Sequence, residues 1–224
     1  MRPRLAAIAA MVRPGCILAD IGTDHAHLCI SLVQTKRIAK AYACDIAPGP
    51  LRFARAEIER AQLQDRIFPI LSDGFAQVPA DADGAVIAGM GFHTAAHILE
   101  EAVDCLWKFS PLIVQVNDDP IRMRSWLSEQ GFFIVDEAYV SDRGKDYSIV
   151  SFDARKKGQY TKTECVLGPV LMRKNEPAYR AYCQRRRRQL AHILALRHDM
   201  RKETLRLSSE MEILTAFLEN GASL

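Results

Sequence analysis

The stretch Ile17-Leu18-Ala19-Asp20-Ile21-Gly22-Thr23-Asp24-His25 decides the fold of this chain. An apolar strand ends in the acid Asp20, and Gly22 follows at the point where a helix begins. Glycine permits a tight turn and a close approach by a ligand, and the N-terminus of the next helix offers unpaired N–H groups and a partial positive charge. In an α/β sheet, such a turn binds a nucleotide-like ligand. The alternative is that Thr23 or Asp24 merely caps the helix.

The residue at position 24 narrows the class of ligand. A dinucleotide-binding loop has the spacing G-x-G-x-x-G, and Asp24 stands where the second glycine would be. A carboxylate there would repel a pyrophosphate. S-adenosylmethionine has no phosphate, and its amino-acid moiety carries an ammonium that acids can hold. We therefore predict S-adenosylmethionine as the cofactor, bound by Asp20, Gly22, Thr23 and His25, with Asp24 beside it.

On both sides of this loop, short apolar runs alternate with amphipathic stretches, which predicts a parallel sheet covered on both faces. The predicted strands are 16–20, 40–45, 67–71, 85–88 and 112–116, and the predicted helices are 25–33, 50–61, 94–102 and 121–130. The stretches 132–140 and 147–152 flank a turn-rich loop with Gly144 and indicate an antiparallel hairpin. The predicted fold class is therefore α/β, a Rossmann-like methyltransferase domain with a C-terminal hairpin.

Three further strand ends carry candidate cofactor residues. Asp45, with Ile46 beside it, ends the second strand, where an acid typically accepts hydrogen bonds from ribose hydroxyls; the alternative is a solvated carboxylate. Asp73-Gly74 follows the third strand, where we expect the adenine ring. Gly89-Met90-Gly91 follows the fourth strand and would let substrate and methyl donor approach the backbone. The motif [ND]-P-P-[FYW] of N6-adenine enzymes is absent there.

The chain changes character near residue 155, where we predict a boundary between a cofactor-binding domain (1–155) and a basic helical domain (156–224). Residues 1–154 carry a net charge of −5 and residues 155–224 a net charge of +8, which favours a polyanionic partner for the second part. Apolar residues follow a heptad pattern from Leu190 to Leu218, interrupted by two polar positions, and predict coiled-coil packing. One long helix and a helical hairpin both fit this pattern.

Composition argues against a membrane protein and against a metal-binding protein. No apolar run is long enough to span a membrane, so no membrane partner is expected. The six cysteines form no C-x-x-C pair, which favours free thiols in the cytoplasm over metal ligands. His93 and His97 have helical i, i+4 spacing without an apparent third ligand, so no metal is predicted.

The sequence resembles the bacterial tRNA adenine-N1 methyltransferases of the TrmK type, in order, over about residues 4–218. The resemblance rests on the segments Asp20–Ala26, Asp73-Gly74, Ile87–Gly91, Trp126–Phe132 and Leu167–Leu171. It implies a Rossmann-like methyltransferase domain, a C-terminal helical coiled-coil domain, S-adenosylmethionine as cofactor and tRNA as substrate, with methylation at N1 of adenine 22. Two positions depart from the family pattern: Phe92 replaces a glycine and Val116 replaces a proline.

The predicted roles follow from the chemistry of adenine N1, which has its own lone pair and needs orientation more than a base. Asp24 and Asn117 are the catalytic candidates, the first for stabilising the cationic product ring. The predicted substrate-binding residues are Phe92 for stacking, Gln115 for the base edge, and Arg185, Arg186, Arg188 and Lys174 for phosphates. Oligomeric state is left open, with a monomer preferred. Two alternatives also stay open: a methyltransferase for another RNA or a small molecule, and a cofactor- and RNA-binding module impaired in catalysis.

Overall fold

The computed structural model describes residues 1–196 and 202–220, which fall into two compact units. The first unit runs from Met1 to Gln159, and the second begins at Tyr160. The assignment of these units as a cofactor-binding domain and a basic domain stays a prediction. Each unit is described by itself below.

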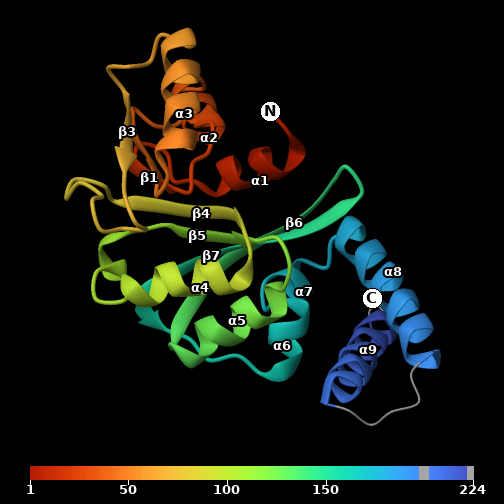
Figure 1. Cartoon of the computed structure of the whole chain (residues 1–224). Helices are drawn as coiled ribbons and strands as arrows, with labels where there is room; N and C mark the ends of the chain where they lie inside the picture. The colour runs from red at the N-terminus through yellow and green to blue at the C-terminus, as the bar shows by residue number, and fades with distance from the viewer. Residues whose placement is uncertain (197–201, 221–224) are drawn as a thin grey trace. The chain divides into compact units, whose positions relative to one another are not determined.

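The first unit is built on a seven-stranded sheet with the order β3-β2-β1-β4-β5-β7-β6 (Figure 1). Its strands are β1 (Ile17–Ile21), β2 (Lys40–Asp45), β3 (Ile67–Leu71), β4 (Gly84–Met90), β5 (Leu112–Val116), β6 (Phe132–Asp142) and β7 (Lys145–Lys157). β1 to β5 pair in parallel, and β7 pairs antiparallel with both β5 and β6. The predicted Rossmann-like class, with a mostly parallel sheet and a C-terminal hairpin, is therefore confirmed.

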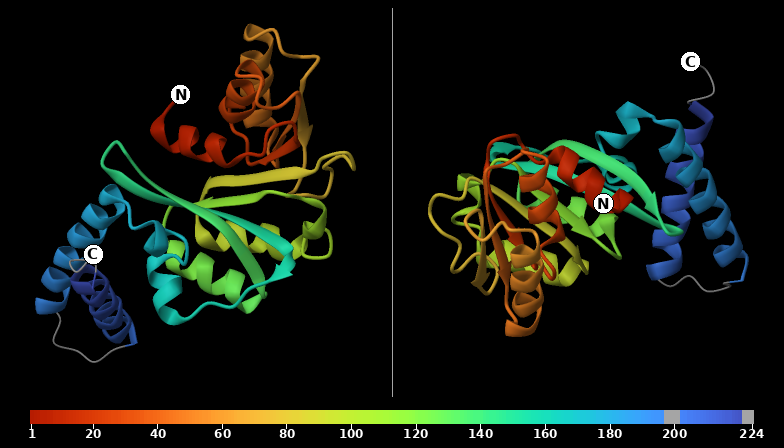
Figure 2. Two further views of the ribbon diagram at one scale, coloured as in Figure 1. Left: turned by 180° about the vertical axis from the view of Figure 1, so that it is seen from behind. Right: turned by 90° about the horizontal axis from the view of Figure 1, so that it is seen from above.

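Helices cover both faces of this sheet (Figure 2). They are α1 (Pro3–Met11), α2 (His27–Gln34), α3 (Pro48–Arg60), α4 (Phe92–Glu101), the 3-10 helix η1 (Leu106–Lys108) and α5 (Pro120–Glu129). Side chains of α1, α2 and α3, such as Ile8, Leu32 and Ile58, share one buried core with Leu18 of β1 and Val86 of β4. α4 and α5 lie on the other face. β1 and β4 are adjacent although their connections run in opposite directions, so a crevice for a ligand lies at their carboxyl ends.

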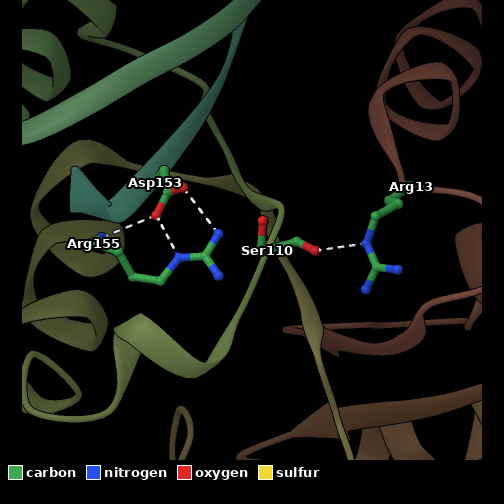
Figure 3. A network of polar contacts seen from close by, with 4 residues as sticks. All are labelled: Arg13, Ser110, Asp153 and Arg155. Carbon is green, nitrogen blue, oxygen red and sulfur yellow. Dashed lines mark hydrogen bonds and ion pairs between the residues drawn. The ribbon is translucent and has the colours of Figure 1, made fainter.

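Arg13 anchors the end of α1 at the opposite edge of the sheet. Its Nε donates to the carbonyl of Ser110 at 2.9 Å (Figure 3). Its Nη2 donates to Asp83 at 2.5 Å. Arg37 donates to the carbonyls of Val12 and Ala10 at 2.6 and 2.7 Å, which satisfies groups at the end of this helix. α1 is therefore fixed by side chains distant in sequence.

Figure 3 also shows how Arg155 is used within β7. Its Nε and Nη2 donate to the two carboxylate oxygens of Asp153, each at 2.9 Å. This pairing holds the pKa of Asp153 below its usual value. Arg155 thus belongs to a two-residue contact within one strand, and its charge is balanced there.

The second unit is helical. It contains α6 (Lys162–Leu167), α7 (Leu171–Lys174), α8 (Pro177–Ala195) and α9 (Lys202–Asn220). The ring of Tyr179 on α8 lies 6.3 Å from that of Phe217 on α9, and Arg186 of α8 pairs with Glu210 of α9, so the two helices run antiparallel. The described residues therefore show a helical pair instead of one long helix. Coiled-coil packing stays a prediction. Two positions of the predicted heptad pattern, Arg197 and Met200, lie outside the described residues.

Two predictions from composition concerned the cysteines and membrane-spanning helices. All six cysteines are free thiols, and all except Cys105 are buried. Within the described ranges, no helix has the length and apolar character that crossing a membrane requires.

Candidate active site

A buried carboxylate closes the carboxyl end of β1. Asp20 is 6% exposed, and its Oδ2 accepts a hydrogen bond from Thr23 Oγ1 at 2.7 Å and a weaker one from Cys29 Sγ at 3.5 Å. Burial raises the pKa of Asp20 to about 6, although both hydrogen bonds lower it. The backbone N–H groups of Gly22 and Thr23 both donate to the carbonyl of Cys44, which ties the loop to β2.

Gly22 brings the cofactor loop into contact with the Gly-Met-Gly segment after β4. Its φ is +75°, and a Cβ there would lie 2.7 Å from Cε of Met90. Only glycine fits this backbone and this approach without displacing the methionine. The two sequence motifs that were predicted to form one site therefore meet in the structure.

The loop continues through two left-handed residues, Asp24 (φ 54°) and Ala26 (φ 55°). The Asp24 side chain is 72% exposed, and its Oδ1 lies 3.5 Å from His25 Nε2. The His25 ring contacts the rings of His27 and Phe53, with centroids 5.4 and 5.3 Å apart. Asp24 thus stands at the opening of the site, while His25 is held in an aromatic row that fixes the loop.

The acid that ends β2 and the acid that follows β3 lie at the same edge of the sheet. Asp45 accepts from Ala47 N at 3.0 Å and from Asp24 N at 3.4 Å. Ile46 exposes 66% of its surface, although it is apolar. Asp73 is exposed at the end of β3, and its neighbour Gly74 has φ +52°. Because β1, β2 and β3 are adjacent and parallel, the three predicted acids Asp20, Asp45 and Asp73 share one edge.

Two pockets open at this edge. One, of about 180 Å³, is lined by Arg4, Leu5, Asp20, Gly22, Thr23, Asp24, His25, His27, Leu28, Ala88 and Gly89. The other, of about 540 Å³, lies between the loop of Asp73 and Gly74 and the α4 residues His97 and Ile98. No group of three or more His, Cys, Asp or Glu side chains suited to a metal occurs among the described residues.

Asn117 joins the tips of β4 and β5. Its Nδ2 donates to the carbonyl of Gly89 at 2.6 Å, and its backbone N–H donates to the carbonyl of Met90 at 2.9 Å. Asn117 is exposed, so it holds this backbone in place at the surface of the site.

Gln115 does not meet the prediction that it reads a base edge. Its side chain is fully buried, its Oε1 accepts from Arg4 at 2.5 Å, and its Nε2 donates to the carbonyl of Val116 at 2.7 Å and to Oδ1 of Asn117 at 3.2 Å. Both ends of the amide are thus engaged by the protein. Gln115 instead orients Arg4 and Asn117, which reach the site.

Phe92 also differs from its predicted role as a stacking surface. Only 8% of it is exposed, and the guanidinium of Arg122 lies 4.5 Å from the centre of its ring. Its backbone N–H donates to Asp118 Oδ1 at 2.8 Å. Burial raises the pKa of Asp118, but hydrogen bonds from the backbone of Phe92 and Asp119 outweigh it and hold this pKa below its usual value. Phe92 therefore starts α4 under a covering arginine and offers no open face to a base.

The basic residues of α7 and α8 divide into two groups. Lys174, Arg185 and Arg188 are exposed. Arg186 donates from Nε and Nη2 to the two carboxylate oxygens of Glu210, at 2.7 and 3.1 Å, and Glu210 is only 4% exposed. Arg186 was predicted to bind phosphates, but its guanidinium is used to join α8 to α9.

Sequence reasoning missed Arg4, Asp118 and Arg122. No local motif marks Arg4, because its partner Gln115 lies 111 residues away. Asp118 lies two residues after β5 and Arg122 in the first turn of α5, so the carboxyl end of that strand was the available signal.

The strand order, the hairpin that closes the sheet and the acids at three successive strand ends define the class: this is a Rossmann-like, S-adenosylmethionine-dependent methyltransferase fold. The family profile described as tRNA (adenine(22)-N(1))-methyltransferase, TrmK, matches residues 18–216. The chain belongs to this family.

Known relatives cover nearly the whole chain. The tRNA (adenine(22)-N(1))-methyltransferase of Bacillus subtilis (strain 168) is 29% identical over 97% of this chain and 97% of its own length. A Streptococcus pneumoniae protein, a candidate tRNA adenine-22 N1-methyltransferase, has a crystal structure that superposes with a TM-score of 0.89 at 30% identity, over 97% of this chain and 99% of that one. Its complex with S-adenosyl-L-methionine gives a TM-score of 0.86 at 31% identity, over 96% and 98% of the two chains.

Proposed function

We propose that the pocket at the carboxyl ends of β1 and β4 binds S-adenosylmethionine for methyl transfer to N1 of adenine 22 in tRNA. The packing of Gly22 against Met90 carries this proposal, because it joins the cofactor loop to the segment where substrate would approach. The residues fit the cofactor: the buried acid Asp20 lines the pocket, and the loop after Gly22 carries a second carboxylate, Asp24, which would repel a pyrophosphate.

In this proposal, the strand-end acids divide the polar groups of the cofactor among them. Asp20 holds the ammonium of the amino-acid moiety, Asp45 accepts from the ribose hydroxyls, and Asp73 accepts from the amino group of adenine. Exposed Ile46 packs against the adenine ring, which would bury apolar surface that water now contacts. Thr23 and His25 keep the loop in the shape that these contacts need.

Bound S-adenosylmethionine supplies an electrophilic methyl group on a sulfonium. Adenine N1 brings its own lone pair, so the protein has to orient the base and exclude water. Asn117 fixes the carbonyl of Gly89 and thereby the backbone on which the base would rest. The product ring is cationic, and the Asp24 carboxylate at the pocket opening would stabilise the charge as it develops.

For tRNA binding, we assign phosphate contacts to the exposed side chains of Lys174, Arg185 and Arg188. Their helices lie in the part of the chain with net charge +8, which a polyanion would meet favourably. We propose the cytoplasm as the site of action, since tRNA and the free thiols belong to a reducing compartment. A monomer is the proposed working state.

The test is transfer of labelled methyl from S-adenosylmethionine to an unmodified tRNA transcript, with a transcript carrying guanine at position 22 as the matched control. N1-methyladenine blocks the Watson–Crick edge, so reverse transcription of the product should stop one nucleotide 3′ of position 22, in the first transcript only. Labelling at another position would favour a different RNA site. Cofactor binding without labelling of either transcript would overturn the proposed activity.

The role of Asp24 needs a variant that keeps the backbone. Asn tolerates the left-handed conformation found at this position, so Asp24→Asn removes the charge with little change in the loop. The proposal predicts a lower rate of methyl transfer with the tRNA KM unchanged. An unchanged rate, with normal cofactor binding, would remove Asp24 from the catalytic residues.

A further inference from the structure

α3 exposes an aromatic ring on the outside of the cofactor loop. Phe53 lies in the second turn of this helix, and 59% of its surface is exposed. The apolar residues Leu51, Ala54 and Ile58 face the core and are at most 4% exposed, so Phe53 projects from another side of the helix. Within the described part of the chain, it lines neither of the two pockets at this edge of the sheet. Core packing therefore does not account for this ring.

Phe53 ends a row of three rings that begins in the loop. The ring centre of His25 lies 5.3 Å from that of Phe53 and 5.4 Å from that of His27. His25 directly follows Asp24, whose exposed carboxylate stands at the opening of the cofactor pocket. α3 lies beside α2 (Figure 1), so the row runs from the pocket opening to the outer surface of α3.

Small residues flank Phe53 along its helix. Gly49 and Ala56 stand four residues before and three residues after it, spacings that place them on the same helix face. A Cβ at Gly49 would meet no atom within 4 Å, and Ala56 is exposed. Glu57, one turn after Phe53, is engaged by Arg60 in an ion pair of 2.5 Å. A planar group can therefore lie against the exposed ring without meeting a bulky neighbour from α3.

Positive charge adjoins this ring, although the unit as a whole is acidic. Residues 46–56 contain Arg52 and Arg55 and no acid, whereas residues 1–154 carry a net charge of −5. Both arginines are exposed, and no ion pair engages either of them among the described residues. Since Arg52 directly precedes Phe53, an unpaired guanidinium and an exposed aromatic face lie next to each other.

We propose that Phe53 stacks on an unpaired base of tRNA beside the target adenine, and that Arg52 contacts a phosphate of the same strand. The proposal rests on the proposed function and adds a contact that positions the RNA at the pocket opening. Aromatic rings beside cationic groups are the combination with which proteins bind unpaired nucleotides. Extrusion of the target adenine uncovers a face of each neighbouring base, and Phe53 would cover one of them.

The alternative is that Phe53 only braces the loop through His25. Filter binding of tRNA in the presence of S-adenosylhomocysteine separates the two roles. It uses an intact transcript and two transcripts with an abasic site, one on the 5′ side and one on the 3′ side of adenine 22. We expect Phe53→Ala to weaken the intact transcript about five- to fiftyfold, as for loss of one base–aromatic stack. On the transcript that lacks the stacked base, the change should be less than about twofold.

Three further variants test the chemistry of the ring. Phe53→Trp keeps an aromatic face and should retain the affinity for tRNA, whereas Phe53→Leu keeps apolar bulk without a flat face and should weaken it as Phe53→Ala does. Trp107→Ala is the matched control, since Trp107 of η1 is 56% exposed in the same unit but lies outside the ring row. It should leave the affinity for tRNA unchanged.

The phosphate contact is tested by salt dependence. Arg52→Gln should lower the slope of log affinity against log salt by about one, because one phosphate contact is lost. Arg60→Gln is the control on the same helix: its guanidinium is already paired with Glu57, so the slope should stay unchanged. An unchanged slope in Arg52→Gln would remove the phosphate contact.

The outcomes for Phe53 are distinct. Equal weakening of all three transcripts by Phe53→Ala would mean that the ring acts through the loop, and it would overturn the stacking proposal. An unchanged affinity for the intact transcript, or a loss of affinity for S-adenosylhomocysteine beyond about twofold, would overturn it as well. Failure of the wild-type protein to bind and methylate tRNA would overturn the proposed function, whereas normal methylation by the wild type confines any failure to Phe53.

Discussion

Thr23 donates a hydrogen bond of 2.7 Å from its hydroxyl to the buried carboxylate of Asp20, three residues earlier in the chain. The contact closes the cofactor loop on itself and keeps the acid at the end of β1. Burial nevertheless raises the pKa of Asp20 to about 6. The charge of this acid therefore changes within a pH range that is accessible to experiment.

Cofactor affinity should follow this titration. The ligand ammonium stays protonated between pH 5 and pH 7, and it needs the ionised form of Asp20. Ionised Asp20 prevails above pH 6 and is lost as the pH falls through that value. The affinity for S-adenosylhomocysteine should thus be about tenfold weaker at pH 5 than at pH 7, because only the ionised fraction binds.

Calorimetric titrations with S-adenosylhomocysteine at several pH values measure how the affinity depends on pH, and Asp20→Asn is the control. The amide cannot ionise, so this variant should bind weakly with a flat pH profile over the same range. A wild-type affinity that does not change with pH would show that Asp20 does not bind the ligand ammonium.

Gly22→Ala should impair cofactor binding more than stability. The matched control is Gly15→Ala, since Gly15 has nearly the same φ, +77° against +75°, but nothing within 4 Å of its Cβ position. Both variants should lose about 1–2 kcal/mol of unfolding free energy from the left-handed backbone. Only Gly22→Ala should weaken S-adenosylhomocysteine, because its methyl group must displace Met90. Equal affinities in the two variants would contradict the role given to the Gly22–Met90 contact.

A buried ion pair joins α5 to the hairpin and should dominate the local stability. Nε of Arg124 donates to Oε1 of Glu137 at 2.6 Å, and the side chains are 2% and 0% exposed. Glu137→Gln removes the charge of the carboxylate that pairs with Arg124 in the core, and should cost about 3–5 kcal/mol in urea unfolding. Arg60→Ala, which breaks a surface pair with Glu57, should cost less than about 1 kcal/mol. A loss for Glu137→Gln as small as that of the surface variant would refute this account.

The strands were predictable because their signals are local. The strands 40–45, 67–71 and 112–116 occur at the predicted residues, since each is a short apolar run with a polar residue or glycine close to its end. The acids Asp20, Asp45 and Asp73 share one edge for the same reason: parallel strands bring their carboxyl ends together.

What the sequence could not supply were contacts between distant residues. α4 begins at Phe92, two residues before its predicted start, because Asp118 on another loop accepts from the Phe92 N–H. Arg186 resembles its arginine neighbours in sequence, and its ion pair with Glu210 on α9 joins residues 24 positions apart. Arg4 and Gln115 form a contact across 111 residues that no spacing rule predicts.

Arg185 and Arg188 are exposed, whereas Arg186 pairs with Glu210, and this difference gives the last prediction. Replacing both Arg185 and Arg188 by Gln should weaken tRNA binding and lower the slope of log affinity against log salt by about 1–2, since each lost phosphate contact releases one counterion fewer. Filter binding at several salt concentrations measures that slope. Arg186→Gln should instead cost about 1–3 kcal/mol of unfolding free energy, because it leaves the buried carboxylate of Glu210 without its ion-pair partner. If Arg186→Gln lowered the salt slope while stability stayed unchanged, the assignment of Arg186 to the helical pair would be wrong.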